Sequence, residues 1–398
     1  MMPLLCDWLH ANGLTWGNLL NGVSVRVVAA AFTAFVLMML VMPPLIRWLR
    51  RKKFGETGAK GDGAHVVDAM REGKKGTPTM GGLGLVLCIA GAALIWCDAS
   101  ELRTYLLVFG LLSFALVGYL DDRTKIFKGA KGTPLFVKLG IQFTAALACG
   151  LVLYQISEST AEQLLPGSHP AGMPAEWYKK YLVGQEYVVR LGVHQVSFPF
   201  VSVEHAVNLG LWSVLWTMLV TVACANGVNF TDGMDGLASG VMLIAALAFM
   251  VIAYITSRVD TADYLQVLYV SGGQETAVFC AAVAGACLGF LWFNSAPAEV
   301  FMGDTGSQAL GGALGLMALC TKQEFLVLLV GFVFVVEAAS VALQIASFRL
   351  RGGKRIFLCA PIHHHFQYLG WPESKIVLRF WIIAALAALF ALMTLKIR

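Results

Sequence analysis

The chain has 398 residues, of which 58% are hydrophobic and only 13% are charged, and its formal net charge is +5. A soluble domain carries charges on about a quarter of its residues. The composition and the mean hydropathy of +0.71 therefore exclude a soluble domain. They predict a membrane protein, and no nucleic-acid partner is expected.

Ten apolar stretches, each long enough to be a membrane-spanning helix, follow one another along the chain. A helix of about 20 apolar residues crosses the roughly 30 Å hydrocarbon core of a bilayer. The eighth stretch is the least apolar because glycines dilute it, but glycine lets membrane helices pack closely. We predict an all-α polytopic membrane protein with ten transmembrane helices in one domain, 1–398. The predicted spans are residues 25–46, 79–97, 104–120, 135–154, 211–228, 237–255, 276–293, 301–320, 325–348 and 376–395.

The N-terminus and the cysteines add little to this prediction. The first ten residues contain no Lys or Arg, so no removable signal peptide is expected. The nine cysteines form no CxxC pair and lie mostly within apolar runs. They are expected to be small core residues, with neither a disulfide framework nor a zinc site.

The basic residues predict how the chain is oriented in the membrane. Nine Lys and Arg residues follow the first span, and basic loops of this kind face the cytoplasm. Ten spans then place both termini on the periplasmic side. The predicted cytoplasmic segments, which carry most of the basic residues, are 47–76, 121–138, 229–236, 294–304 and 349–375.

The longest predicted periplasmic segment is the insert 155–207. Its second half alternates apolar and polar residues imperfectly, which is typical of a short hairpin on the outer surface. A structural or lipid-contacting role is the favoured interpretation, and a substrate-binding cap is the alternative. The alternating residues are Leu191, Val193, Val196, Phe198 and Phe200.

Five hydrophilic clusters lie at the ends of the predicted spans, all on the cytoplasmic side of this topology. Ionisable groups are costly near hydrocarbon, so their repeated occurrence at helix ends indicates a functional site. The clusters are KKGTPTMGG (74–82), LDDRTK (120–125), NFTDGMDG (229–236), NSAPAEVFMGDTGS (294–307) and PIHHHF (361–366).

Two adjacent carboxylates follow the third span. Neighbouring helix residues point about 100° apart, so Asp121 and Asp122 are not expected to share one ligand. One is expected to face the site while the other pairs with Arg123 or Lys125. A solvated helix end is the alternative interpretation.

The NFTDGMDG cluster places Asn229, Asp232 and Asp235 three residues apart. This spacing predicts that they stack along one face of a helix. The two glycines would allow close approach to the start of the next span, and helix N-termini attract phosphates. The alternative is that these residues are only N-caps.

In MGDTGS, Asp304 stands between two glycines at the start of a span. It is the candidate ligand for Mg²⁺, which binds one or two protein carboxylates together with substrate phosphates. An N-cap is again the alternative. Asn294 and Phe301, just upstream, could contact or stack on a base.

The remaining candidates are basic. His363, His364 and His365 lack the i,i+4 spacing of helical zinc ligands, so they are expected to bind phosphate or another group of the site. A polar loop without a binding role is the alternative. Lys74 precedes a tight turn and is a candidate phosphate partner. The clusters contain several carboxylates, lysines and histidines, which favour metal-assisted phosphoryl chemistry between a soluble anion and a lipid.

Taken together, DD, NFTDGMDG, MGDTGS and PIHHHF resemble the motifs of the polyprenyl-phosphate N-acetylhexosamine-1-phosphate transferases. The resemblance runs from the first span to the last, and PIHHHF is similar to the form found in the branch that acts on muramoyl-pentapeptide. It implies that UDP-MurNAc-pentapeptide and undecaprenyl phosphate react, with Mg²⁺, to give lipid I and UMP. It also implies a ten-helix homodimer in the bacterial inner membrane.

The same resemblance implies roles for individual residues. Asp304 would hold Mg²⁺, and Asp121 and Asp122 would be catalytic. The uridine would be held by Lys74, Asn294 and Phe301, with Lys125 near the phosphates. The rest of the site would be formed by Asn226, Asn229, Asp232, Asp235, His363, His364 and His365.

The favoured mechanism is direct attack of the lipid phosphate oxygen on the phosphate attached to the sugar. A phosphate monoester has a second pKa of about 6 and is largely ionised at pH 7, so a base has little to contribute. A two-step route through a covalent aspartyl intermediate is the alternative, because carboxylates can act as nucleophiles.

Two other functions compete with this interpretation. The nearest is the same chemistry on UDP-GlcNAc. The other is a transporter of an anionic solute, which should carry charged groups near the middle of broken helices. Within the predicted spans, Glu337 and Arg379 are the main charges, which makes a transporter a remote alternative.

Overall fold

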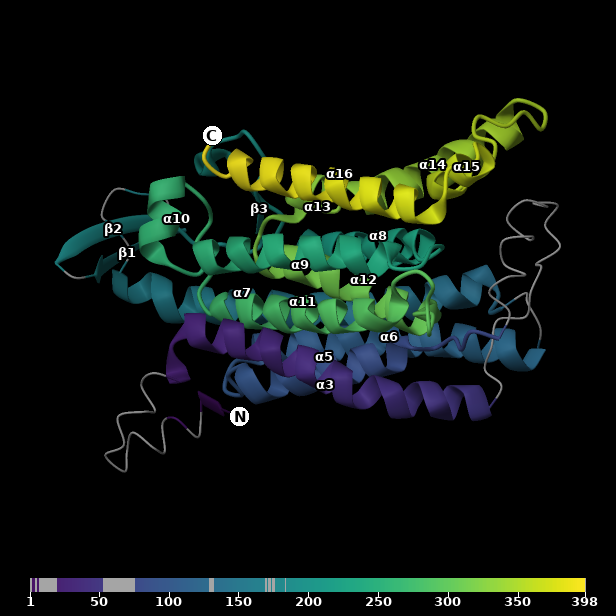
Figure 1. Cartoon of the computed structure of the whole chain (residues 1–398). Helices are drawn as coiled ribbons and strands as arrows, with labels where there is room; N and C mark the ends of the chain where they lie inside the picture. The colour runs from purple at the N-terminus through teal and green to yellow at the C-terminus, as the bar shows by residue number, and fades with distance from the viewer. Residues whose placement is uncertain are drawn as a thin grey trace.

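In the computed structural model, long helices run alongside one another as a bundle with a small β region at one end (Figure 1). The structure describes residues 2, 3, 6, 20–52, 76–128, 132–168, 170, 173, 176–182 and 184–397. The long helices are α3 (Val23–Arg51), α5 (Gly82–Trp96), α6 (Leu102–Lys128), α7 (Leu135–Ser168), α8 (Trp212–Thr231), α9 (Leu237–Thr256), α11 (Gln274–Asn294), α12 (Gly303–Cys320), α14 (Phe332–Leu350) and α16 (Glu373–Thr394). The short ones are α10 (Val259–Leu265), α13 (Val327–Val330), α15 (Ile362–Tyr368) and the 3₁₀ turns η1 (Val203–His205) and η2 (Glu324–Leu326).

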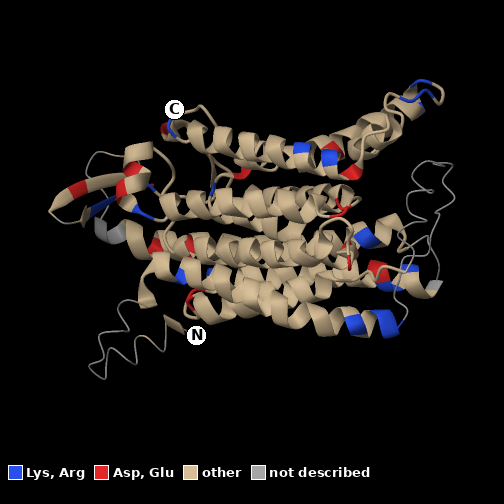
Figure 2. Cartoon of the chain, in the orientation of Figure 1, with Lys and Arg blue, Asp and Glu red and all other residues tan. Residues whose placement is uncertain are grey.

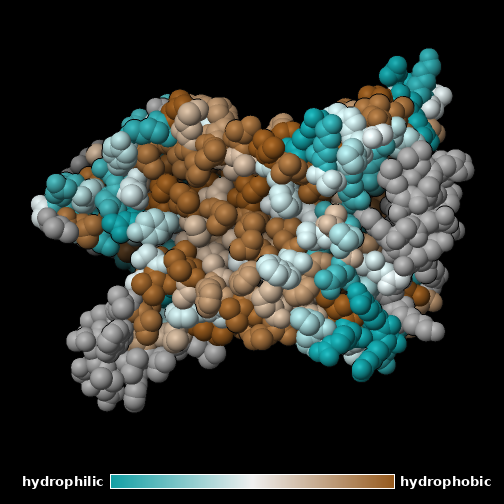
Figure 3. Space-filling view, in the orientation of Figure 1, coloured by the Kyte–Doolittle hydropathy of each residue, from teal (hydrophilic) through white to brown (hydrophobic). Residues whose placement is uncertain are grey.

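Eight of the described helices are long and apolar enough to cross a membrane, which confirms a polytopic membrane protein. Hydrophobic side chains cover the middle of the molecular face in Figure 3, and charged residues gather toward the two ends of the bundle in Figure 2. The other two predicted spans correspond to α5 and α12. The first has only 15 residues, and the second is rich in glycine; both pack among the longer helices.

Helix α12 is the centre of the bundle, and its glycines are the reason. Every residue from Thr305 to Cys320 is buried, and the helix packs closely against α6 and α8. A Cβ atom on Gly311 would overlap the backbone of Ala225 in α8, and one on Gly312 would meet the ring of Phe114 in α6. Close packing of small residues replaces the hydrophobic side chains that this span lacks.

Several helix boundaries differ from the prediction. Helix α6 continues to Lys128, so the segment expected to begin a loop at 121 is still helical. Helix α7 continues to Ser168, well into the predicted insert. The ninth span is interrupted at Gly331, after which α14 leads toward α15 at the upper right of Figure 1. Apolar composition locates a span, but polar residues extend a helix beyond it.

The insert does contain a hairpin, but the predicted position was wrong. Strands β1 (Trp177–Leu182) and β2 (Gln185–Arg190) pair antiparallel, upstream of the alternating residues. Within those residues, the short strand β3 (Gln195–Val196) pairs with β4 (Val207–Asn208). Leu191 forms an isolated β-bridge with Tyr269, and the ring of Phe198 stacks on Phe325. The alternation does not mark one buried face, because Gln195 and Ser197 are buried while Phe200 is exposed.

The packing of α12 on α8 predicts the effect of a larger residue at Gly311. Gly311→Val is expected to lower the free energy of unfolding by about 1–3 kcal/mol, because the side chain would force the two helices apart. Thermal unfolding of the detergent-solubilised protein measures this. Gly140→Val is the matched control, because Gly140 is exposed on α7 and a Cβ there meets nothing within 4 Å. Equal destabilisation by both variants would contradict the packing argument.

Candidate active site

The described parts of the five polar clusters meet at one end of the bundle. The Phe301 backbone N–H donates to Pro78 O at 2.9 Å, and Gly81 N–H donates to Phe301 O at 2.9 Å. Segment 294–307 also contacts segments 120–125 and 229–236. Segment 361–366 contacts segment 229–236. The described parts of the clusters therefore lie together, as the prediction that all five are on one side of the membrane requires.

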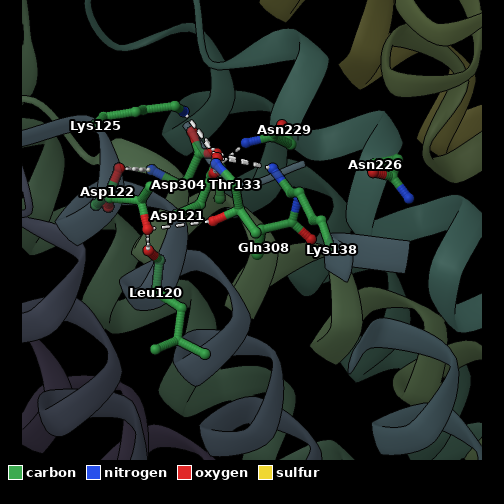
Figure 4. A network of polar contacts seen from close by, with 12 residues as sticks. Leu120, Asp121, Asp122, Lys125, Thr133, Lys138, Asn226, Asn229, Asp304 and Gln308 are labelled. Carbon is green, nitrogen blue, oxygen red and sulfur yellow. Dashed lines mark hydrogen bonds and ion pairs between the residues drawn. The ribbon is translucent and has the colours of Figure 1, made fainter. Parts of the chain in front are cut away.

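Two carboxylates and two lysines form the centre of this region (Figure 4). Lys125 Nζ lies 2.9 Å from Asp121 Oδ2 and 2.9 Å from Asp304 Oδ2. Lys138 Nζ makes the same two contacts, at 3.2 and 2.9 Å. All four side chains are at most about one-third exposed. The arrangement pairs two negative charges with two positive ones, so neither carboxylate is left as an uncompensated charge near hydrocarbon.

The close approach of α6 to α12 brings these carboxylates together. A Cβ on Gly118 would overlap the Asp304 carbonyl, so only glycine lets the two backbones come so near. Asp304 lies in the first turn of α12, where the helix dipole stabilises a negative charge. Asp121 is also fixed by Thr133, whose backbone N–H donates to Oδ1 at 2.7 Å.

Asp122 has a different structural role from Asp121. Its Oδ1 accepts the Asp304 backbone N–H at 3.0 Å, and its Oδ2 accepts the N–H and the hydroxyl of Thr305 at 2.9 and 2.7 Å. Asp122 therefore caps the N-terminus of α12 from another helix. As predicted, the two aspartates point apart, and it is Asp121 that both faces the cluster and pairs with Lys125.

Lys138 is the main residue of this cluster that sequence reasoning missed. The sequence identifies it only as one of the basic residues of the predicted cytoplasmic segment 121–138. In the structure it lies in the first turn of α7 and bridges Asp121 and Asp304. The available signal was its place at the edge of an otherwise apolar run, since a charge there has to be paired.

The prediction that Asn229, Asp232 and Asp235 stack on one helix face was wrong. Helix α8 ends at Thr231, Asp232 follows as its C-cap, and α9 starts only after Gly236, whose φ is +77°. Glycine permits that left-handed conformation and so allows the turn. Asp235 lies in the turn, where its Oδ2 accepts the Ala298 N–H at 3.2 Å.

Buried amides form a second polar layer one helical turn deeper than the charged cluster. Gln142 Nε2 donates to Gln308 Oε1 at 2.7 Å, and Asn226 Nδ2 donates to Gln142 Oε1 at 3.2 Å. Asn229 Nδ2 donates to the Ser307 hydroxyl at 2.9 Å. Asn226 thus lies apart from the charged cluster (Figure 4), and both asparagines join α8 to its neighbours.

The three residues predicted to hold uridine are placed differently from one another. Asn294 is buried and bonded on both sides: Oδ1 accepts from Gly236 N–H and Ser239 Oγ, and Nδ2 donates to Val300 O. Its amide therefore braces the loop that carries Phe301. Lys74 lies outside the described residues, but the segment that follows it is anchored to Phe301.

The three histidines, which begin α15, each have a different partner. His363 is fully buried, with Nδ1 3.0 Å from Glu337 Oε2. His364 Nδ1 lies 2.7 Å from Gln367 Oε1. His365 Nδ1 accepts the Leu358 N–H at 3.2 Å. Of the three, His363 is the one whose ring borders the turn between α8 and α9.

The carboxylates Asp121 and Asp304 fit a magnesium ion. No group of three or more His, Cys, Asp or Glu side chains is placed to hold a metal in the described part of the chain. Mg²⁺ needs no such cage, because it prefers one or two carboxylates completed by substrate phosphates and water. Two converging carboxylates beside two lysines are a donor set of that kind.

An apolar cavity of about 450 Å³ lies between α14, α15 and α16. Its lining includes Phe332 and Val336 of α14, Phe366 of α15 and Ile383 of α16. Arg379 also lines it and lies over the ring of Trp371, 4.3 Å from the centroid. A wall of this composition accepts hydrocarbon.

Comparison with known proteins shows similarity over nearly the whole chain. Residues 104–322, from α6 to the end of α12, match the model of glycosyl transferase family 4. A protein of Solidesulfovibrio magneticus named phospho-N-acetylmuramoyl-pentapeptide-transferase is 42% identical over 96% of each chain. Proteins of the same name from Thermodesulfovibrio yellowstonii and Desulfotalea psychrophila are each 40% identical, again over 96% of each chain.

The capping contacts predict that Asp122 contributes to stability. Asp122→Ala is expected to lower the free energy of unfolding by about 1–2 kcal/mol, because the first turn of α12 loses its acceptors. Thr305→Val removes only the hydroxyl contact and should cost less. Thermal unfolding of both variants tests the order. Lost activity in Asp122→Ala with unchanged thermal stability would argue against the cap.

Proposed function

The chain belongs to the family of the phospho-N-acetylmuramoyl-pentapeptide transferases, and we propose that it transfers phospho-MurNAc-pentapeptide from UDP-MurNAc-pentapeptide to undecaprenyl phosphate. The products are lipid I and UMP, and the reaction is a step of peptidoglycan synthesis. The relatives support the substrate. The observation that supports the chemistry is the convergence of Asp121 and Asp304 with Lys125 and Lys138 at one end of the bundle.

The two lysines are the residues that bind the diphosphate of the nucleotide substrate. Each is now held between Asp121 and Asp304, within 3.2 Å of both carboxylates. An arriving diphosphate would compete for these ammonium groups, which lie close enough together to contact one anion. During transfer they stabilise the negative charge that develops on the departing UMP.

Asp121 and Asp304 would hold Mg²⁺ together with substrate phosphates. When bound there, the ion polarises the phosphoryl group and neutralises charge on the leaving phosphate. Asp304 is the principal ligand in this proposal because it stands at the start of α12 and Asp122 fixes its backbone. Asp122 itself acts as a positioning residue.

Direct attack by the lipid phosphate remains the mechanism we propose. Both oxygens of Asp122 accept hydrogen bonds from the start of α12, which leaves that carboxylate poorly placed as a nucleophile. Asp121 is fixed by Thr133 and by two lysines. A fixed, charge-paired carboxylate is better suited to orienting the incoming phosphate than to forming a covalent intermediate.

The nucleotide would bind where the segment after Lys74 meets the loop that carries Phe301. Phe301 is the proposed stacking partner for uracil, and Asn294 supports its loop. His363 and the turn at Asp232 and Gly233 would lie near the sugar. The remaining histidines, His364 and His365, support the fold of their loop.

The prenyl chain of the lipid carrier would lie in the apolar cavity between α14, α15 and α16. This cavity is lined by Phe366, which directly follows the three histidines, so it begins next to the polar site. Arg379 is the proposed contact for the lipid phosphate as it approaches. The cavity thus explains how a membrane lipid could reach a water-soluble co-substrate.

The membrane arrangement is also a proposal. We infer ten spans, with α5 and α12 completed by the helices around them, and both termini in the periplasm. The basic residues near the site end of the bundle support a cytoplasmic site in the inner membrane (Figure 2). The homodimer is carried over from the family resemblance alone.

Release of UMP tests the proposed function directly. Purified protein with undecaprenyl phosphate and Mg²⁺ is expected to release UMP from UDP-MurNAc-pentapeptide and not from UDP-GlcNAc. Release from UDP-GlcNAc alone would keep the chemistry and change the substrate. No release from either, with folded protein, would reject the transferase function.

Asp304→Asn tests the proposed metal ligand. The amide keeps the shape of the side chain and leaves the Asp122 contacts to the backbone intact, so the protein should remain folded. Turnover is expected to fall by at least about 100-fold, and the Mg²⁺ concentration for half-maximal rate should rise. Near-normal turnover at the same Mg²⁺ concentration would remove Asp304 from the metal site.

A further inference from the structure

Glu337 is a buried acidic side chain that the reaction described above does not use. It lies in α14, six residues after the interruption at Gly331, and is fully buried. A carboxylate at membrane depth is costly unless it is paired, and one that is retained there indicates a function. Its Oε2 lies 3.0 Å from Nδ1 of His363, which is also fully buried.

His363 is held between Glu337 on one side and the α8–α9 turn on the other. A Cβ on Gly233 would overlap Nε2 of the imidazole, so the ring occupies the space that a side chain at 233 would need. Gly233 lies four residues after Asn229, just beyond the end of α8, and Asn229 is bonded to Ser307 near the start of α12. The Nε2 edge of His363 therefore faces the segment that leads to the charged cluster.

The two nitrogens of His363 are in different environments. A carboxylate 3.0 Å from Nδ1 favours a proton on that nitrogen, which would leave Nε2 as the nitrogen that meets a ligand. Among the described residues, neither ring nitrogen of His363 and neither carboxylate oxygen of Glu337 makes a well-aligned hydrogen bond, although Nδ1 and Oε2 lie 3.0 Å apart. Unpaired polar atoms at a fully buried site are costly, and an oxygen of a bound substrate would satisfy Nε2.

Resting on the proposed transferase function, we propose that Glu337 is a positioning residue for His363. It holds the imidazole in one tautomer and one orientation, with Nε2 directed at an oxygen of the bound phospho-sugar. Glu337 does not itself touch the substrate. Its effect on the reaction passes entirely through His363.

A double-mutant cycle on turnover tests this dependence. Glu337→Ala is expected to lower kcat by about 10- to 100-fold, as for other residues that orient a functional histidine. Glu337→Gln, which still offers an oxygen to Nδ1–H, should recover most of the rate. His363→Ala should lose at least as much as Glu337→Ala, and the double variant should lose no more than His363→Ala alone.

Two further variants test whether a loss of kcat comes from a change in the orientation of the His363 ring. Ser340→Ala removes another buried polar group from α14, one whose hydroxyl donates to Glu337 O, without touching His363. It should leave kcat unchanged. Gly233→Ala pushes the ring from the opposite side and should lower kcat in the same way as Glu337→Ala, which keeps the test open if Glu337→Ala fails to fold.

Several results would overturn the proposal. A Glu337→Ala variant with wild-type kcat would do so, as would losses that multiply in the double variant, because Glu337 would then act independently of His363. The same cycle is run on the thermal unfolding temperature, which requires no turnover. If the two substitutions were coupled in the unfolding temperature but not in kcat, the pair would stabilise the fold without positioning His363 for the reaction. If the wild-type protein itself released no UMP, the transferase function would fail while the unfolding cycle still reported on the pair.

Discussion

The contact between the end of α6 and the first turn of α12 is the constraint on which the rest of the site depends. Gly118 removes the side chain that would keep the two backbones apart, and Asp122 then caps α12 across the interface. This contact aligns Asp121 with Asp304. Without it, the two carboxylates could not share Lys125 and Lys138, because neither lysine could reach both.

Charge and amide contacts are arranged in layers from the end of the bundle inward. Lys138 and Gln142 stand one turn apart on α7, as do Asp304 and Gln308 on α12. The pair Lys138–Asp304 is thereby repeated one turn deeper by neutral amides. Since the cost of a charge rises with depth in hydrocarbon, charges occupy the outer layer and amides the inner one. The outer layer remains available to a substrate.

Most of the fold was predictable because apolar runs locate membrane helices, and the predicted spans correspond to the long helices of the structure. The boundaries were less predictable. Charged residues at 121, 122 and 125 fall in a predicted cytoplasmic loop, yet they continue α6, and partners on α12 pair them. The reverse happened at 232–236, where a helical spacing of polar residues proved to be a turn set by Gly236.

The sequence by itself determined the membrane class, the positions of the spans and the polar clusters that form the site, because each of these follows from local composition and spacing. Only the tertiary structure decided which contacts, and therefore which role, each member of a cluster has. Asp121 faces the lysines while Asp122 caps a helix, and His363 pairs with Glu337 while its neighbours bond within their own loop. These differences depend on which neighbour lies within about 3 Å of each side chain, and such contacts join residues far apart in the chain.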